Sequence, residues 1–198
     1  AQKPTNQEPL KLQTTLDYQE LTNRSATQGE PAIYGNTIVW SDVRNGDYDI
    51  YAYTFSNNTV WPVCIYPGTQ KNPAIYRNWV VWQDSRNEHY DIYCKNITTG
   101  KVSRLSTSTR HDMSPNIHDN RVVWYSYTGS PGGGEKSDIV MYDLNKWSLT
   151  ELTADSAIQY EPDIHGNNIV WHDNRNGNWE IYGFDLSSGK EHRVTEHE

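Results

Sequence analysis

The sequence predicts an all-β protein, a β-propeller of four four-stranded blades plus a surplus N-terminal strand. Three observations predict this: a repeat that recurs four times, short runs of alternating apolar and polar residues, and aromatic residues that are mostly Tyr (14) and Trp (8) rather than Phe (2). Tyr and Trp suit the half-buried surfaces of strands. Units of about 40–45 residues with four strands each are typical of propeller blades.

The repeat is clearest at a Pro-x-Ile segment. PAIYGNTIVW starts at Pro31, PAIYRNWVVW at Pro73, PNIHDNRVVW at Pro115 and PDIHGNNIVW at Pro162, at spacings of 42, 42 and 47 residues. Each copy ends in a tryptophan, and we expect these four in equivalent positions between sheets: Trp40, Trp82, Trp124 and Trp171. The longer third unit contains YTGSPGGGEKS (127–137), whose Gly, Pro and Ser content indicates a loop.

Each unit reads as four strands. The first is the Pro-x-Ile segment and the second ends near the tryptophan. The third lies at 47–53, 89–95, 137–143 and 178–184, and the fourth ends in Val63, Leu105, Leu152 and Val194. A lone sheet of this kind leaves both apolar faces in water, whereas stacking sheets around an axis buries them. We therefore divide the propeller, 31–198, into repeats 31–72, 73–114, 115–161 and 162–198.

The N-terminal extension, residues 1–30, contains a segment similar to a fourth strand. In LDYQELTN (16–23), Leu21 lies ten residues before Pro31, as Leu105 lies ten before Pro115. The fourth unit already has its own last strand at 189–197, so this strand is surplus. It could latch the ring, begin an incomplete fifth blade, or pair with a neighbouring subunit, because an open edge templates association. We expect a homo-oligomer or a complex with another surface protein, built by strand addition as a filament.

An Asp-x-Arg-Asn motif follows the second strand in three units. It contains Asp42 and Arg44, Asp84 and Arg86, and Asp173 and Arg175. Asn-Gly favours a tight hairpin, and the Asp can accept turn N–H groups or pair with the Arg. Recurrence favours a structural role over catalysis, and the Arg counts against the alternative of a Ca²⁺ site. The third unit has Ser126 instead of the Asp, so its hairpin must be held differently.

Four rings follow the prolines by three residues and are the candidate ligand-binding residues: Tyr34, Tyr76, His118 and His165. If the first strand of each blade is innermost, these rings face the central channel together and could bind a small ligand or a metal. Ordinary packing between blades is the competing interpretation.

The remaining features limit the function classes. A net charge of −8 disfavours nucleic acid, and no apolar run is long enough for membrane insertion. No nucleophile, phosphate-loop or zinc-protease motif occurs, so we expect no enzyme activity, cofactor or metal. Cys64 and Cys94 permit either one disulfide or two buried thiols.

The unit P-x-I-x-G-x-x-I-V-W-x-D-x-R-N-G-x-x-D-I-Y resembles the repeats of TolB-like β-propellers, especially those of surface-layer proteins, over residues 31–198. The resemblance implies secretion to the cell surface and a structural or assembly role, with no catalytic residues to carry over. A propeller that binds carbohydrate or peptide is the alternative, and a polysaccharide lyase is a third.

Overall fold

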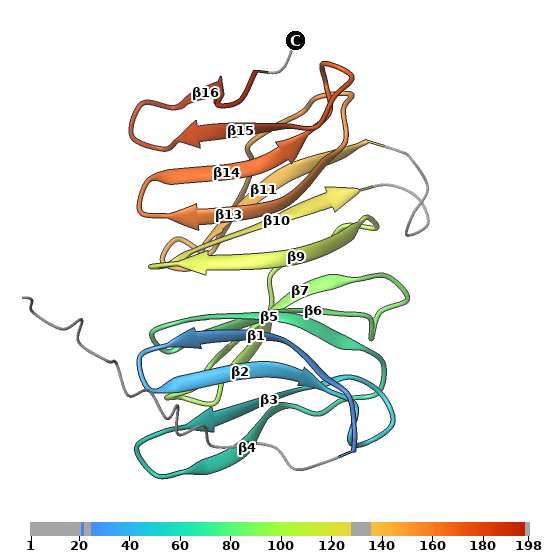
Figure 1. Cartoon of the computed structure of the whole chain (residues 1–198), viewed down its shortest axis with the longest axis vertical. Helices are drawn as coiled ribbons and strands as arrows, with labels where there is room; N and C mark the ends of the chain where they lie inside the picture. Colours follow the sequence, from blue (N-terminus) through green and yellow to red (C-terminus); the bar gives the residue numbers. More distant parts are fainter. Residues whose placement is uncertain (1–20, 22–24, 128–135, 197–198) are drawn as a thin grey trace, which may run out of the picture.

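The computed structural model describes residues 21, 25–127 and 136–196, which form sixteen strands and no helix. The strands make four antiparallel four-stranded sheets that follow one another along the molecule (Figure 1). The all-β prediction with four blades is therefore confirmed. The predicted surplus strand at 16–23 lies, except for Leu21, outside the described residues. Within the described part of the chain, no helix could cross a membrane.

Each sheet is a meander in which consecutive strands pair, so each blade is one continuous stretch of chain. Blade 1 contains β1 (Gln28–Tyr34), β2 (Thr37–Asp42), β3 (Asp49–Thr54) and β4 (Thr59–Cys64). Blade 2 contains β5 (Gln70–Tyr76), β6 (Trp79–Asp84), β7 (Asp91–Asn96) and β8 (Val102–Arg104). Blade 3 contains β9 (His111–His118), β10 (Arg121–Tyr127), β11 (Ser137–Asp143) and β12 (Ser148–Glu151). Blade 4 contains β13 (Gln159–His165), β14 (Asn168–Asp173), β15 (Glu180–Asp185) and β16 (Lys190–Arg193).

The first strand of every blade is the inner one. β1 packs beside β5, β5 beside β9 and β9 beside β13. Blades 1 and 4 stand at opposite ends of the row, with β4 and β16 farthest apart (Figure 1). The four blades therefore form an arc with two end faces. The inner strands begin three or four residues before the prolines that mark the repeats.

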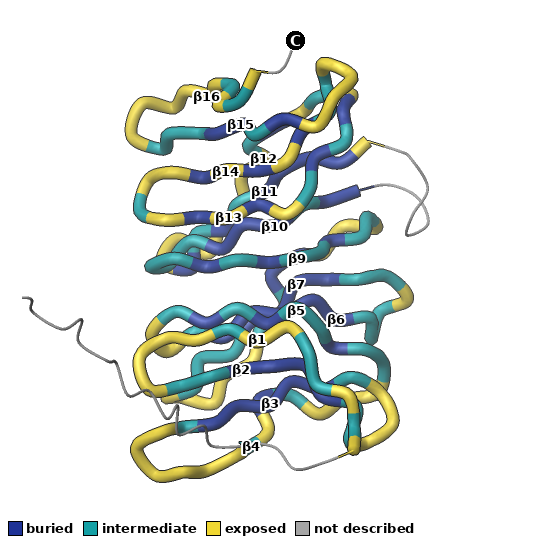
Figure 2. The backbone as a smooth tube through the Cα atoms, viewed as in Figure 1, coloured by how far each residue is buried: buried dark blue, intermediate teal, exposed yellow. Residues whose placement is uncertain are grey.

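The core consists of three apolar clusters, one at each junction between blades. Trp82 packs against Val39 and Ile50 of blade 1, Trp124 against Val81 and Ile92 of blade 2, and Trp171 against Val123 and Ile139 of blade 3. The three tryptophans are at most 1% exposed. Burial accordingly concentrates on the middle strands and exposure on the turns (Figure 2). These three tryptophans therefore lie in equivalent places between sheets, whereas Trp40 does not.

Trp40 lies on the outward face of blade 1, in a smaller cluster with Tyr51 and Tyr53. Leu21 packs against this cluster. Val63 is the residue at the corresponding place in the Trp82 cluster, and both lie ten residues before the next repeat's proline. Leu21 therefore occupies the position of a last-strand residue from a preceding blade.

The disulfide between Cys64 and Cys94 is not formed, and both thiols are free. Cys64 lies beside the cluster between blades 1 and 2, whereas Cys94 belongs to the cluster between blades 2 and 3. The sheet of blade 2 separates the two sulfurs. Burial raises the pKa of Cys64 to about 11 and that of Cys94 to about 12, so both thiols stay protonated near neutral pH.

Candidate functional site

The inner strands carry a repeated backbone irregularity. The residue before each repeat proline has a positive φ: Glu30 (55°), Asn72 (50°), Ser114 (50°) and Glu161 (50°). The pairing of each inner strand with its neighbour shifts at the same place. Such bulges bend a strand and re-aim its side chains. Positive φ is uncommon outside glycine, so the surrounding sheet imposes this conformation.

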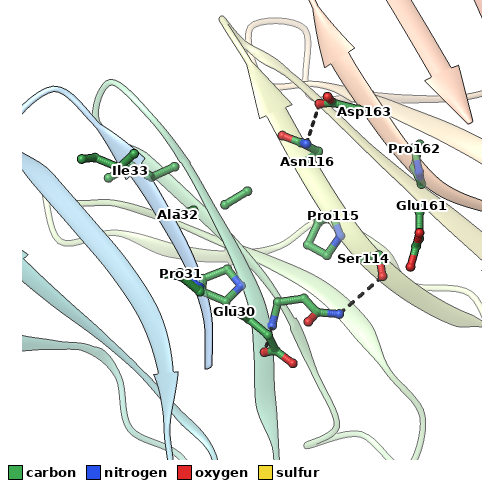
Figure 3. Close-up of a pocket in the computed structure, with 14 residues that line it drawn as sticks. Glu30, Pro31, Ala32, Ile33, Ser114, Pro115, Asn116, Glu161, Pro162 and Asp163 are labelled. Atoms are coloured by element: carbon green, nitrogen blue, oxygen red, sulfur yellow. Dashed lines mark hydrogen bonds between the residues drawn. The ribbon is translucent and has the colours of Figure 1, made fainter. Parts of the chain in front are cut away.

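These bulges line a concavity of about 530 Å³ on the inner face of the arc, where all four inner strands contribute (Figure 3). Its polar lining includes three carboxylates, those of Glu30, Glu161 and Asp163. Glu30 Oε2 accepts hydrogen bonds from Ser41 Oγ (2.6 Å) and from the backbone N–H of Asn72 (2.8 Å). Asn116 Nδ2 donates to Asp163 Oδ1 at 2.6 Å. The lining therefore combines prolines and aliphatic side chains with carboxylates, and two of these carboxylates, Glu30 and Asp163, are hydrogen-bonded to a neighbouring blade.

The four predicted rings form one continuous row. The ring centroids of Tyr34 and Tyr76 are 4.7 Å apart, those of Tyr76 and His118 4.6 Å, and those of His118 and His165 4.4 Å. Each ring is the last residue of an inner strand. The row therefore borders the concavity, whose lining consists of the residues just before the rings.

Packing between blades accounts for part of this row. His118 Nδ1 accepts the backbone N–H of Gly166 in blade 4 at 3.1 Å. The pKa of Tyr76 is raised by desolvation and by a hydrogen bond to Asp119. Tyr34 and His165, the two ends of the row, remain exposed. Among the described residues, no group of three His, Cys, Asp or Glu side chains is arranged to hold a metal ion.

The Asp-x-Arg motif forms a buried structural network, as its recurrence indicates. Asp42 accepts the Trp40 indole N–H at 3.0 Å and the Arg44 backbone N–H at 2.9 Å. The Arg44 guanidinium also pairs with Asp42 and lies 3.8 Å from the centroid of Tyr51. The same contacts recur around Asp84 and Asp173. The Asp thus both accepts turn N–H groups and pairs with the Arg.

Hydrogen bonds from the motif lower the pKa of two of these carboxyls, Asp42 and Asp173. Burial alone would raise the pKa of Asp42, but the hydrogen bonds from Arg44 and Trp40 outweigh it and the pKa is lowered. The pKa of Asp173 is lowered for the same reason, by Arg175, Trp171 and Gln159 against the effect of burial.

Blade 3 supplies its carboxylate from a different strand. Asp112 of β9 accepts the Trp124 indole N–H at 2.9 Å. Asp112 pairs in register with Ser126, as Gln159 pairs with Asp173 in blade 4. In blade 3, therefore, the Asp that accepts the indole N–H lies on the first strand, and the second strand has Ser126 in the place of the usual Asp. Burial raises the pKa of Asp112 against hydrogen bonds from Ser126, Ser106 and Trp124.

Sequence reasoning missed Asp112. The signal was present three residues before each proline, where the other units have Gln28, Gln70 and Gln159. Blade 3 has Asp112 where the other units have Gln, and Ser126 where the other units have Asp. The two differences together indicate that the carboxylate has moved from the second strand to the first.

No family model matches the sequence, and no curated protein matches it. Solved structures do match in fold. TolB from Acinetobacter baumannii aligns with a TM-score of 0.63 at 16% identity, over 82% of this chain and 42% of that one. A puromycin hydrolase gives 0.70 at 10% identity, over 90% and 31%. Oligogalacturonate lyase from Vibrio parahaemolyticus gives 0.69 at 8% identity, over 90% and 56%. The chain thus has a TolB-like propeller fold, shared with TolB and with enzymes, and spans less than two thirds of each of these structures.

Proposed function

We propose that this chain is a non-catalytic assembly module of the extracellular surface, which associates with further copies of itself through the outward face of blade 4. The TolB-like fold occurs in TolB as well as in enzymes, so it is compatible with a non-catalytic role but does not by itself assign one. The surface location rests on the resemblance of the repeats to surface-layer proteins.

The proposal rests on the exposure of two apolar residues of blade 4 whose counterparts in the other blades are buried. Val39, Val81 and Val123 face the following blade and are 0% exposed, whereas Val170 of blade 4 is 39% exposed. At the last-strand position, Val63 and Leu105 are 3% and 4% exposed, whereas Val194 is 55% exposed. The sequence thus repeats an interface surface on a face that no blade of the described residues covers. Exposed apolar patches of this kind mark interaction sites.

The internal junctions indicate what covers such a face. At each of them the surface receives the tryptophan of the next blade. Blade 1 of a second copy presents the same residue, Trp40. Head-to-tail stacking would place Val194 of one copy where Leu21 of the other packs, so Leu21 would be exchanged for Val194. Strand addition by residues 16–23 remains the alternative route to an oligomer.

Light scattering over a range of protein concentrations tests the proposal. We expect the chain of 22.9 kDa to show a larger mass that falls to the monomer in the double variant Val170→Asp, Val194→Asp, because buried charges oppose docking. Val102→Asp is the matched control, since Val102 is 44% exposed but lies on the outer strand of blade 2. A wild-type monomer at every concentration, or a double variant of unchanged mass, would overturn end-face docking.

Deleting residues 1–25 separates the two routes. Strand addition predicts that the deletion gives a monomer while the double variant keeps its mass. End-face docking predicts the reverse, because the deletion removes Leu21 from Trp40 and leaves the face of blade 4 intact.

Binding of a carbohydrate or peptide at the row of rings is a second candidate. The exposed rings of Tyr34 and His165 favour it, since stacked aromatic rings suit both ligands. A glycan array hit or calorimetric binding should be lost in Tyr34→Ala and His165→Ala and kept in Phe55→Ala, which removes an exposed aromatic ring from a turn of blade 1. Turnover of a uronate polymer would instead support a lyase and contradict the non-catalytic proposal.

A further inference from the structure

A cavity of about 430 Å³ lies in blade 3 beside Asp112. The Asp112 residue is 2% exposed, and it lines the cavity together with Trp124 and Ser126. In the other three blades, the carboxylate bonded to the equivalent indole also pairs with an arginine. The position of that arginine in blade 3 is Thr128 in the sequence, which lies outside the described residues.

The guanidinium is held in the same way where it is present. Arg86 meets Asp84 as a fork, with Nε 2.9 Å from Oδ1 and Nη2 2.5 Å from Oδ2. Arg175 makes the corresponding bonds to Asp173 at 3.0 and 2.6 Å. Paired parallel bonds of this kind fit a guanidinium and not an ammonium ion.

Further contacts surround each guanidinium. In blade 2, the rings of Tyr93 and Tyr66 lie 4.3 and 3.9 Å from the guanidinium carbon of Arg86. In blade 4, Glu191 and Asp155 lie 2.6 and 3.6 Å from Nη1 of Arg175. The guanidinium is therefore contacted from the third strand, the fourth strand and the loop before the inner strand.

Smaller or apolar residues stand at each of these positions in blade 3. Val140 faces Trp124 in register as Tyr93 faces Trp82. Ser108 lies four residues before Asp112, as Tyr66 lies four before Gln70 and Asp155 four before Gln159. Leu149 pairs with Tyr142 as Glu191 pairs with Phe184. Val140, Ser108 and Leu149 all line the cavity, so the cavity coincides with the place that a guanidinium fills in blades 2 and 4.

The charges around the cavity suit a cation. Arg110 also lines it, but its Nη1 lies 3.5 Å from both Asp138 and Glu151. Two carboxylates thus surround this arginine. The donors to Asp112 are neutral, namely the Trp124 indole and the hydroxyls of Ser106, Ser108 and Ser126. Burial raises the pKa of Asp112, whereas the pKa of Asp42 and of Asp173 is lowered, which agrees with a carboxyl that has no cationic hydrogen-bond partner in the described part of the chain.

We propose that this cavity binds a guanidinium group, either an arginine side chain of a protein partner or a free alkylguanidine, with its N–H groups on the carboxylate of Asp112. Val140 and Leu149 provide apolar surface for the attached methylene groups. The site would thus accept from another molecule the group that the neighbouring blades supply themselves.

The test uses the indole N–H signals of the full chain in ¹⁵N NMR, with Trp124 assigned through Trp124→Phe. Titration with N-methylguanidinium at constant ionic strength should shift the Trp124 signal saturably, with a Kd on the order of 1 mM. The signals of Trp82 and Trp171 should not move, because Arg86 and Arg175 already occupy their carboxylates. Methylammonium should bind at least about tenfold more weakly.

Two variants locate the site. Ser108→Tyr places in blade 3 the ring that blade 2 has at Tyr66, and it should abolish the shift. Thr98→Tyr, on an exposed turn of blade 2, is its control and should bind normally. Asp112→Asn keeps an acceptor for the indole and should weaken binding by at least about tenfold, which keeps the proposal testable if Ser108→Tyr does not fold.

Comparing ligands identifies the source of the guanidinium. Tighter binding of a blocked arginine-containing tripeptide than of N-methylguanidinium would indicate a protein side chain, and equal affinities would indicate a free alkylguanidine. The proposal is overturned if no saturable shift occurs, if methylammonium binds equally well, or if Asp112→Asn binds like the wild type.

Discussion

Asp112 accepts the indole N–H of Trp124 from the neighbouring strand at 2.9 Å, whereas the Asp that serves each other repeated tryptophan lies two residues after it on the same strand. The indole keeps its acceptor although the Asp has moved. Every blade therefore has a carboxylate beside the indole N–H of its repeated tryptophan. Two paired positions, one on the first strand and one on the second, can provide that carboxylate.

Asp112→Ala should lower the free energy of unfolding by about 2–3 kcal/mol, because it leaves a buried indole N–H without an acceptor. The double variant Asp112→Gln, Ser126→Asp reproduces the Gln159–Asp173 pair, in which Gln159 Nε2 donates to Asp173 Oδ2 at 2.9 Å. Urea unfolding should therefore show the double variant to be more stable than Asp112→Gln alone. Additive losses from the two single changes would show that the two positions are not interchangeable.

The carboxyls of this network should respond to pH with opposite signs. The pKa of Asp42 and Asp173 is lowered from 3.8, so their stabilisation is present above that value and is lost as pH falls through the folded-state pKa. The pKa of Asp112 is raised from 3.8, so its relative stabilisation is greatest below that value and is lost as pH rises through the folded-state pKa.

Unfolding by urea at a series of pH values checks this difference. The stability deficit of Asp112→Asn relative to wild type should be largest in acid and should narrow as the pH rises above 3.8. Asp173→Asn should show the opposite trend: its stability deficit relative to wild type should be small at low pH and should grow as the pH rises towards 3.8. Parallel curves for the two variants would contradict the assigned shifts.

The repeat predicted most of the fold because a blade is a local structure. Strand pairing inside each blade joins consecutive segments, so the spacing of Pro31, Pro73, Pro115 and Pro162 carries the architecture. The contact between Tyr34 and Tyr76 followed from the same logic, since equivalent positions on adjacent inner strands become neighbours.

The rest depended on contacts between blades and on departures from the repeat. The pairing of Cys64 with Cys94 was open because the sequence does not say on which side of a sheet each sulfur lies. The cavity beside Asp112 arises from differences at Ser108, Val140 and Leu149, positions far apart in sequence that meet only in the folded blade. A repeat motif describes only what the four units share. It therefore gives no sign that three differences meet at one place in blade 3.

Trp82→Ala and Trp40→Ala should differ in cost although the two residues are equivalent in sequence. Trp82 is 0% exposed and belongs to a cluster that contains four buried side chains of blade 1, so its removal should cost about 4 kcal/mol. Trp40 is 5% exposed and lies at the end of the arc, where its cluster is smaller. We expect about half the cost for Trp40→Ala, measured by urea unfolding, and equal costs would show that the end face is packed as tightly as a junction.

The hairpin after the second strand offers a pair of reciprocal substitutions. Gly46 of blade 1 has φ 108° and Gly177 of blade 4 has φ 90°, and Glu88 stands at this position in blade 2 with φ 73°. A Cβ added at Gly46 would meet no atom within 4 Å, so any penalty there comes from the backbone conformation alone. Gly46→Ala should therefore destabilise the protein by about 1 kcal/mol.

Glu88→Gly should have the opposite effect. It removes the cost of a left-handed side-chain-bearing residue, about 1–2 kcal/mol, and adds the greater unfolded-state entropy of glycine, about 0.5–1 kcal/mol. The net change should be a stabilisation of up to about 1 kcal/mol, read as a higher midpoint of urea unfolding at unchanged slope. Glu88→Ala is the control, because it removes the carboxylate but keeps the Cβ and should bring no gain. If Glu88→Ala stabilised the protein as much as Glu88→Gly, the charge and not the backbone would be the source of the effect.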